Sequence, residues 1–199
     1  MRTLTRLILP MVMVTATTAT GCAGEGPRLA LGQDPKTGET VAITVALPNT
    51  RAHRSYSLGS WVMCLDRPGS VTIDRIDLIK PQGGMVLQAF SSRPQSRTHE
   101  MLGNAEQPLT ELGFPARSPA VTTPCAEEER NTVHTELGLQ YGKTGDATAS
   151  AEGVHLTYTS AGRQRTVDFS LTVELCAPGD MITRRCEDMY EEMRRAEEE

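Results

Sequence analysis

The sequence contains no apolar run long enough to cross a membrane as a helix. Its longest apolar run, residues 7–14 (LILPMVMV), has about eight residues, whereas a spanning helix needs roughly 20. Aromatic residues make up only 4% of the chain and include one tryptophan, Trp61, which leaves little material for stacking on nucleic-acid bases. The formal net charge of −5 gives no basic surface for phosphates. We therefore expect no helical membrane span and no nucleic-acid partner.

The usual sequence signatures of catalysis and cofactor binding are also missing. There is no G-x-S-x-G turn for a nucleophilic serine, no H-E-x-x-H zinc motif, no glycine loop of the Walker or G-x-G-x-x-G kind, and no calcium-loop pattern. The pair Gly83-Gly84 and residues 143–146 are typical of structural turns. Without an activated nucleophile, an acid–base pair or a ligand cluster, the sequence predicts no catalytic residue, no cofactor and no enzyme activity.

The first 22 residues carry the pattern of an export signal. Arg2 and Arg6 form a basic start, the apolar run follows, and residues 15–21 are small and weakly polar. Residues 19–22 (ATGC) resemble the signal of bacterial lipoproteins, in which small residues precede a cysteine that is lipidated and becomes the new N-terminus. The resemblance implies a signal peptide at residues 1–21 and lipidation of Cys22.

Lipidation would place the protein on the extracytoplasmic face of the cell membrane. A net acidic chain is not drawn to anionic headgroups, so the anchor has to be covalent. A diacylglyceryl group, with palmitate among its expected chains, supplies the two acyl chains that stable anchoring needs. The alternative is an ordinary secretion signal cleaved after Gly21, with Cys22 merely nearby and the protein freely secreted.

The cysteine count agrees with a lipidated Cys22. The chain has five cysteines, and an odd number in an exported protein needs an explanation. Without Cys22, an even set remains for disulfides in an oxidising compartment, namely Cys64, Cys125, Cys176 and Cys186. Four cysteines allow three pairings. We expect Cys64–Cys125 and Cys176–Cys186, because the second bridge would pin the C-terminal helix to the last strand. Zinc would need close C-x2-C pairs, which are missing.

Alternating apolar and polar residues predict β-strands after residue 40. We expect strands at residues 41–47, 58–65, 71–78, 85–90, 133–141, 154–159 and 167–175. The last three should each have one apolar face and one wet face, as in an antiparallel sheet packed on a core. The alternation shifts phase at Asp74-Arg75, which predicts a bulge, and the turn at residues 160–163 predicts a hairpin. About seven short strands predict an all-β fold, an Ig-like antiparallel β-sandwich with a C-terminal amphipathic helix.

Glycine and proline divide the chain into regions. Residues 22–40 are expected to be a flexible, unstructured tether, followed by one sandwich domain at residues 41–180. Within that domain, repeated prolines predict a long irregular connection at residues 91–131, with a short helix near residues 107–112. Residues 181–199 have apolar residues at helical spacing in an acidic background, which predicts a helix or tail in which Glu191 pairs with Arg195.

The histidines are the remaining candidates for a metal site. They are His53, His99, His134 and His155. His134, Glu136 and His155 fall on the wet phase of their expected strands. A hairpin centred near Ala147 would place His155 opposite about Leu139 rather than His134, so we predict surface histidines and no metal site.

The body of the chain is similar to small uncharacterised lipoproteins of actinobacteria. The likeness rests on residues 64–73 (CLDRPGSVTI), residues 137–139 (LGL) and the Leu175-Cys176 ending, and it covers most of residues 61–176. It implies a cell-envelope location and no known activity. The sequence thus predicts a non-catalytic, membrane-anchored binding or accessory module for an unknown protein or cell-wall partner.

Two alternatives remain open. An enzyme would have its site in the 91–131 connection, which would then close over a pocket with convergent polar groups. A structural or interaction protein would show a contiguous apolar patch on an otherwise wet face.

Overall fold

The computed structural model describes residues 25–32, 42–95, 100–118, 120–125 and 134–197, and it confirms the all-β sandwich. The signal peptide, Cys22 and His99 lie outside the described residues. The strands are β1 (Leu29–Leu31), β2 (Ile43–Leu47), β3 (Tyr56–Leu65), β4 (Val71–Ile79), β5 (Met85–Gln95), β6 (Asn104–Ala105), β7 (His134–Lys143), β8 (Ala149–Ala151), β9 (Gly153–Ser160), β10 (Arg163–Phe169) and β11 (Leu171–Leu175). A short 3-10 helix, η1 (Leu109–Leu112), and the helix α1 (Arg184–Glu197) complete the fold.

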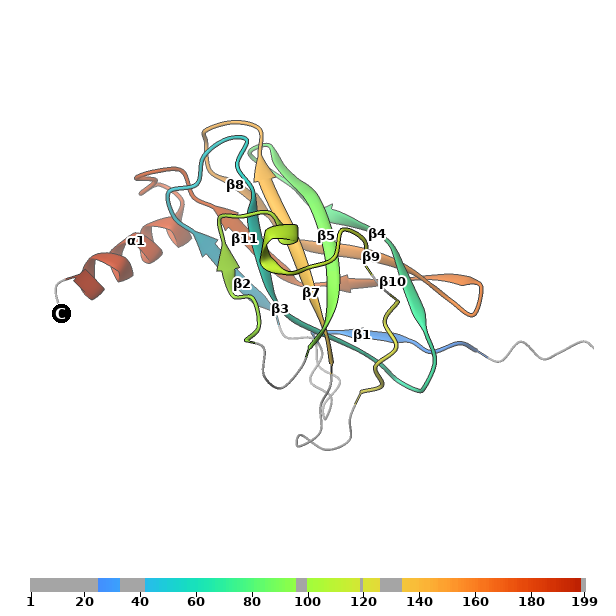
Figure 1. The fold of residues 1–199 in the computed structure, drawn as a ribbon. Helices are drawn as coiled ribbons and strands as arrows, with labels where there is room; N and C mark the ends of the chain where they lie inside the picture. The colour runs from blue at the N-terminus through green and yellow to red at the C-terminus, as the bar shows by residue number, and fades with distance from the viewer. Residues whose placement is uncertain (1–24, 33–41, 96–99, 119, 126–133, 198–199) are drawn as a thin grey trace, which may run out of the picture.

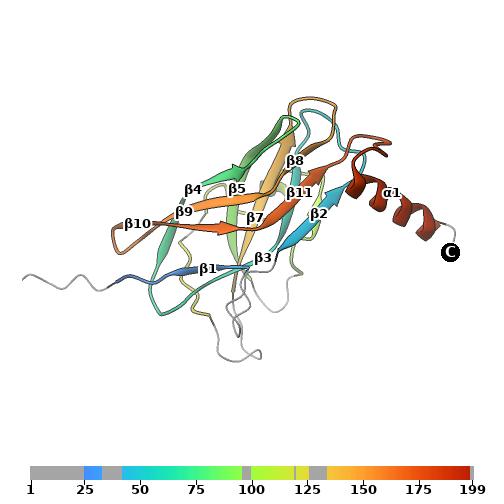
Figure 2. The same ribbon diagram turned by 180° about the vertical axis from the view of Figure 1, so that it is seen from behind.

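The strands form two layers with the hydrophobic core between them (Figure 1; Figure 2). One layer is the sheet β1-β3-β7-β5, with β6 paired to β3. The other consists of two three-stranded sheets, β10-β9-β4 and β2-β11-β8. These two sheets follow each other along the layer, because β8 leads into β9 and β10 leads into β11.

The expected single strand at residues 167–175 is two strands in two sheets, so that prediction is wrong. β10 pairs with β9, whereas β11 pairs with β8 and, in parallel, with β2. The change falls at Ser170, between the fully buried Phe169 and Leu171. Here β9 begins at Gly153, where an added β-carbon would lie 2.5 Å from the Phe169 carbonyl oxygen. The backbones of β9 and β10, which are neighbours in one sheet, approach closely at this point, and the chain then exchanges β9 for β8 and β2 as its partners.

Other local predictions are confirmed. The register of β4 against β9 shifts between Ile73 and Arg75, at the expected bulge. β9 and β10 form the expected hairpin, with Arg163 opposite Ser160. The short helix η1 lies within the expected residues 107–112.

The unstructured tether expected over residues 22–40 is wrong for residues 29–31. These residues form β1, which pairs antiparallel with the end of β3, and both Leu29 and Leu31 are buried. The Leu29 N–H also donates to the Tyr158 hydroxyl across the core, at 3.3 Å. Two leucines are too short a pattern to predict a strand among glycines and prolines, but they supply enough apolar surface to close one edge of the sheet.

The 91–131 connection is less irregular than expected. β5 continues to Gln95 and takes Pro94 into its ladder with β7. A proline is tolerated there because β5 is an edge strand, whose outer backbone groups need no partner strand. Beyond β5, the connection forms β6 and η1 and pairs with β4 through Val71 and Val121.

This connection covers the outer face of β7, so the prediction of a wet face on that strand is wrong. Leu109 and Phe114 are buried against Gly138. Arg93 holds the segment in place by donating to the Leu112 carbonyl oxygen at 2.8 Å and lying 4.3 Å from the centre of the Phe114 ring. β7 is therefore buried on both faces, like a central strand of a larger core.

Gly138 should not tolerate a side chain, because its surface is occupied by this cover. A β-carbon there would lie 2.7 Å from Leu109 Cδ2 and 2.8 Å from Phe114 Cε1. We expect Gly138→Ala to lower the free energy of unfolding by about 1–3 kcal/mol, as overpacking does. Gly145→Ala is the control, since nothing lies within 4 Å of its added carbon. Urea unfolding followed by Trp61 fluorescence would measure both, and equal midpoints would contradict the packing of the connection on β7.

The C-terminal helix is attached at its first turns and projects from the sandwich (Figure 1). Tyr190 contacts the sandwich: its hydroxyl accepts from the Asn49 N–H at 3.0 Å and donates to the Ala177 carbonyl oxygen at 3.0 Å. The expected Glu191–Arg195 pair is present at 3.1 Å. Ile182, one of the apolar residues in the expected helical segment 181–199, lies before the helix and is 96% exposed. Among the described residues, no helix has the length and apolar character to span a membrane.

Candidate functional site

The four cysteines downstream of Cys22 form both predicted disulfides. Cys64–Cys125 joins the end of β3 to the connection over β7, and Cys176–Cys186 joins the end of β11 to α1. The Cα–Cα distances are 4.8 and 5.7 Å. These cysteines are structural, and none of them keeps a free thiol.

The residues considered for a metal site are placed apart. His134 and Glu136 are on β7, whereas His155 is on β9 in the other layer. The predicted position of His155 opposite Leu139 is wrong, because β7 and β9 belong to different sheets.

Each of these side chains has its own surroundings. His155 stands on the exposed face of the β9–β10 hairpin, where its Nδ1 lies 2.5 Å from an Asp168 carboxylate oxygen. Glu136, expected to be wet, is fully buried under the connection. Its two oxygens accept from the Arg93 Nε–H at 2.7 Å and from the Leu102 N–H at 2.6 Å. Glu136 is thus a structural group that fastens the connection to the sheet.

One cluster in the described residues has the composition of a metal site. Glu174, Cys176 and Cys186 offer ligand atoms within 4.8 Å of one another. The two sulfur atoms are bonded to each other, however, and zinc binds thiolates rather than disulfide sulfur. The Glu174 carboxylate accepts from Arg185 at 3.1 Å. The cluster therefore anchors α1 and has no free ligand to offer.

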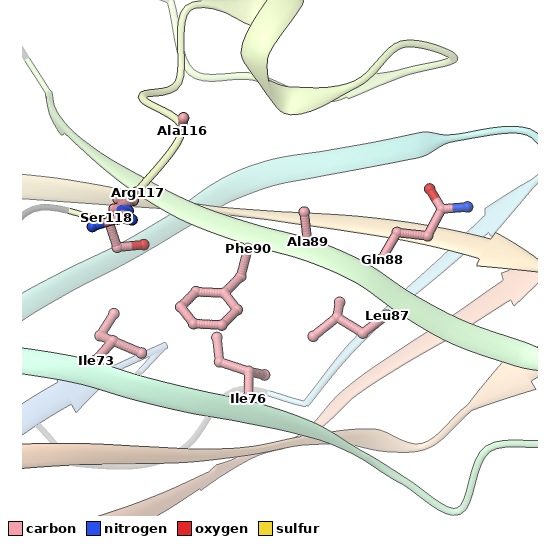
Figure 3. Close-up of a pocket in the computed structure, with 9 residues that line it drawn as sticks. All are labelled: Ile73, Ile76, Leu87, Gln88, Ala89, Phe90, Ala116, Arg117 and Ser118. Carbon is pink, nitrogen blue, oxygen red and sulfur yellow. The ribbon is translucent and has the colours of Figure 1, made fainter.

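A groove lies between β4 and β5, which are edge strands of the two layers. This groove has a volume of about 520 Å³ (Figure 3). Its lining residues are Ile73, Ile76, Leu87, Gln88, Ala89, Phe90, Ala116, Arg117 and Ser118. The last three come from the 91–131 connection, so two edge strands and the connection meet at this one place.

Two bulges shape the apolar part of the groove. In an unbroken strand, residues three apart point to opposite faces. The register of β4 shifts between Ile73 and Arg75, and that of β5 shifts between Leu87 and Ala89. Each shift adds one residue to the alternation of side chains. Ile73 and Ile76 therefore point to the same face of β4, and Leu87 and Phe90 point to the same face of β5. Figure 3 shows these four side chains gathered between the two strands.

The polar groups of the groove are gathered toward its ends. Arg117 and Ser118 lie at the end next to Ile73 and Phe90, and Gln88 lies at the other end (Figure 3). The Ser118 hydroxyl oxygen is buried and has no hydrogen-bond partner among the residues that the structure describes. Buried polar groups are nearly always paired, so this hydroxyl is a site where a ligand atom would be favoured.

The backbone around Arg117 and Ser118 is fixed on both sides. Upstream, the Ser91 hydroxyl donates to the Pro115 carbonyl oxygen at 2.7 Å. Downstream, Val121 exchanges two backbone hydrogen bonds with Val71, at 2.9 and 3.0 Å. The wall of the groove is therefore held by β4 and β5 themselves.

Two other hollows are polar, and charges in them already have partners. One is lined by His53, Arg54, Ser55, Glu106, Gln107, Pro108 and Glu111, and the other by Gln82, Ser150, Ala151, Glu152, Thr172, Glu174 and Arg185. Arg54 lies 2.9 Å from Glu106, and Arg185 lies 3.1 Å from Glu174.

The buried Lys143 is likewise a structural group. Burial lowers the pKa of Lys143, whose Nζ donates to the carbonyl oxygens of Asp146 and Ala147 at 3.1 and 3.0 Å. It closes the turn between β7 and β8, in agreement with the structural turn expected at residues 143–146. The groove between β4 and β5 is accordingly the strongest candidate for a binding site in the described residues.

Comparisons with known proteins do not assign the chain to a family. No family model matches it, and no curated protein matches it either. The sequence and the geometry of the groove are therefore the only guides to function in the described part of the chain.

Proposed function

We propose that this protein is a non-catalytic envelope lipoprotein, held on the extracytoplasmic face of the cell membrane by a lipid on Cys22. The sandwich acts as a binding module through the groove between β4 and β5. Its partner is a ligand, protein or cell-wall component outside the cytoplasmic membrane.

The cysteine pairing is the observation that carries the anchor. Every cysteine from residue 64 onward is in a bridge, as suits an oxidising compartment. Cys22 is the one cysteine left over, and it stands at the end of an export-type sequence with small residues before it. Lipidation accounts for an odd cysteine in an exported protein, whereas a free thiol there would be open to oxidation.

The chemistry of the groove supports binding rather than catalysis. Its polar side chains are a guanidinium, a hydroxyl and an amide. A guanidinium stays protonated and cannot act as a base, and an amide does not titrate. A serine nucleophile needs a base within hydrogen-bond reach, and no described residue gives the Ser118 hydroxyl such a partner. The enzyme alternative requires polar groups of the connection to converge on a pocket. Arg117 and Ser118 do lie together at one end of the groove, but their side chains are suited to binding a ligand and not to catalysis.

Mass spectrometry of the protein expressed in its host tests the anchor. We expect a mature N-terminus at Cys22 that carries a diacylglyceryl group, with the protein in the membrane fraction. Cys22→Ala should abolish the lipid mass and leave the protein either unprocessed or released. Thr17→Ala, a change within the same signal, should keep the lipid and the location.

An unlipidated N-terminus in the unmodified chain would contradict the proposal. It would favour the freely secreted alternative, with Cys22 as an unpaired thiol. In that case, dimers linked through Cys22 should appear on non-reducing gels and disappear in Cys22→Ala.

A further inference from the structure

We propose that the groove between β4 and β5 binds a long-chain fatty acid, with the acyl chain between the two strands and the carboxylate at Arg117 and Ser118. This gives a ligand class to the binding module proposed above and rests on that proposal. It follows from three properties of the groove: an apolar middle, a polar end and a buried hydroxyl with no partner among the described residues.

The middle of the groove fits an unfunctionalised chain. Ile73, Ile76, Leu87 and Phe90 line it from two strands, and Leu87 and Phe90 keep part of their surface exposed. Its volume of about 520 Å³ lies within the range of small-molecule sites. A sugar would need polar partners along its length, but the polar side chains of this groove stand near its ends. A flexible hydrocarbon chain requires only apolar contact, which these four residues supply.

The end near Ile73 fits an anionic head group. Arg117 is exposed and forms no ion pair with any of the described residues. A guanidinium donates to carboxylates in a planar, two-point geometry, and a hydroxyl donates one further hydrogen bond. A carboxylate bound there would neutralise Arg117 and accept from the Ser118 hydroxyl, which is buried without a partner in the described part of the chain. The head group would face water and the chain would run inward along β5.

Photolabelling in isolated host membranes tests this proposal on the full chain. The probe is palmitic acid with a diazirine in the middle of its chain and a terminal alkyne. Without added ATP or coenzyme A, the probe remains a free acid. We expect light-induced labels on the peptides that contain residues 73–76 and 87–90, and we expect excess unlabelled palmitic acid to remove them.

Matched variants separate the groove from general contact with the bilayer. Leu87→Trp fills the groove and should lower labelling by about tenfold or more, equivalent to about 1.4 kcal/mol of binding free energy. Val86→Trp, at an exposed site on the opposite face of β5, should leave labelling unchanged. Arg117→Gln should lower it about two- to fivefold, as expected for an exposed charge contact. Arg163→Gln, which changes an exposed arginine at the start of β10, is its control.

Arg117→Gln keeps the test decisive if Leu87→Trp fails to fold, since Arg117 is exposed and supports no described contact of the core. Labels outside β4 and β5, labels that palmitic acid does not displace, or equal labelling of Arg117→Gln and Arg163→Gln would overturn the proposal. Labelling by a diazirine lysophosphatidate and not by the acid would overturn the carboxylate head group.

The same sample distinguishes the two proposals. A lipid on Cys22 without displaceable labels in the groove would mean that the fatty-acid site is wrong and the anchor is right. Displaceable labels in a chain without a lipid on Cys22 would mean that the fatty-acid site is right and the anchor is wrong. Each result is read from a different peptide of one digest.

Discussion

Glu136→Ala is expected to lower the free energy of unfolding by about 3–5 kcal/mol, the usual cost of removing one partner of a buried ion pair. Glu136 is fully buried, and its oxygens hold Arg93 at 2.7 Å and the Leu102 N–H at 2.6 Å. Without it, both donors lose an acceptor in a place that water does not reach. The Arg93 charge, only 17% exposed, would then lack its counterion.

Urea unfolding followed by Trp61 fluorescence measures this effect, because Trp61 lies in the core with its ring centre 5.4 Å from that of Phe169. Glu152→Ala is the matched control. It removes the Lys80–Glu152 pair, in which both side chains are more than half exposed, and should cost less than about 1 kcal/mol. Similar costs for the two variants would show that Glu136 is not the buried link between the connection and the sheet.

The Cys64–Cys125 bridge should contribute more stability than the second bridge. Replacing both cysteines with alanine opens a loop with a sequence separation of 61, which corresponds to about 4 kcal/mol in the chain-entropy model. The bridge also ties the connection, and with it one wall of the groove, to the end of β3. We therefore expect the double variant to unfold at clearly lower urea concentration.

Cys176→Ala with Cys186→Ala is the comparison for this bridge. Its sequence separation is 10, worth about 3 kcal/mol at most in the same model. Because α1 contacts the sandwich through few residues, it can detach while the sandwich stays folded. Far-ultraviolet circular dichroism should then lose helical signal before Trp61 fluorescence changes. A larger loss of core stability from this pair than from Cys64 and Cys125 would contradict the prediction.

The sequence was sufficient for the fold class because alternation reports which face of a strand is buried. It could not report which strand lies alongside. From Val167 to Leu175 the alternation continues unbroken, although the chain changes sheets at Ser170. When the chain changes its neighbouring strand but its side chains keep pointing alternately inward and outward, the two-residue pattern of the sequence does not change.

The burial of β7 on both faces could not be predicted from the sequence, for a different reason. Gly138 and Glu136 occupy the phase that is normally wet, and a glycine and a carboxylate are ordinary surface residues there. The close approach of Leu109 and Phe114 requires a glycine, and pairing with Arg93 makes a buried carboxylate tolerable. All three partners lie 24 to 43 residues away in the chain, so no local pattern joins them.

Part of the groove could have been found in advance. The phase shift at Asp74-Arg75 predicted the bulge of β4, and the spacing of Leu87 and Phe90 carries the same signal in β5. What the sequence did not contain is that these two strands form the facing edges of opposite layers. That arrangement follows from the order of the sheets, which is set by contacts across the whole domain.

The bulges of β4 and β5 also bear on how copies of this protein coexist at high concentration. An edge strand with a flat, regular backbone can pair with the edge of a neighbouring molecule and so begin an aggregate. Bulges interrupt the regular spacing of backbone donors and acceptors and increase the local twist, so a second edge cannot match them over many residues. The irregularities that open the groove are thus the same ones that keep its rims from joining those of another copy.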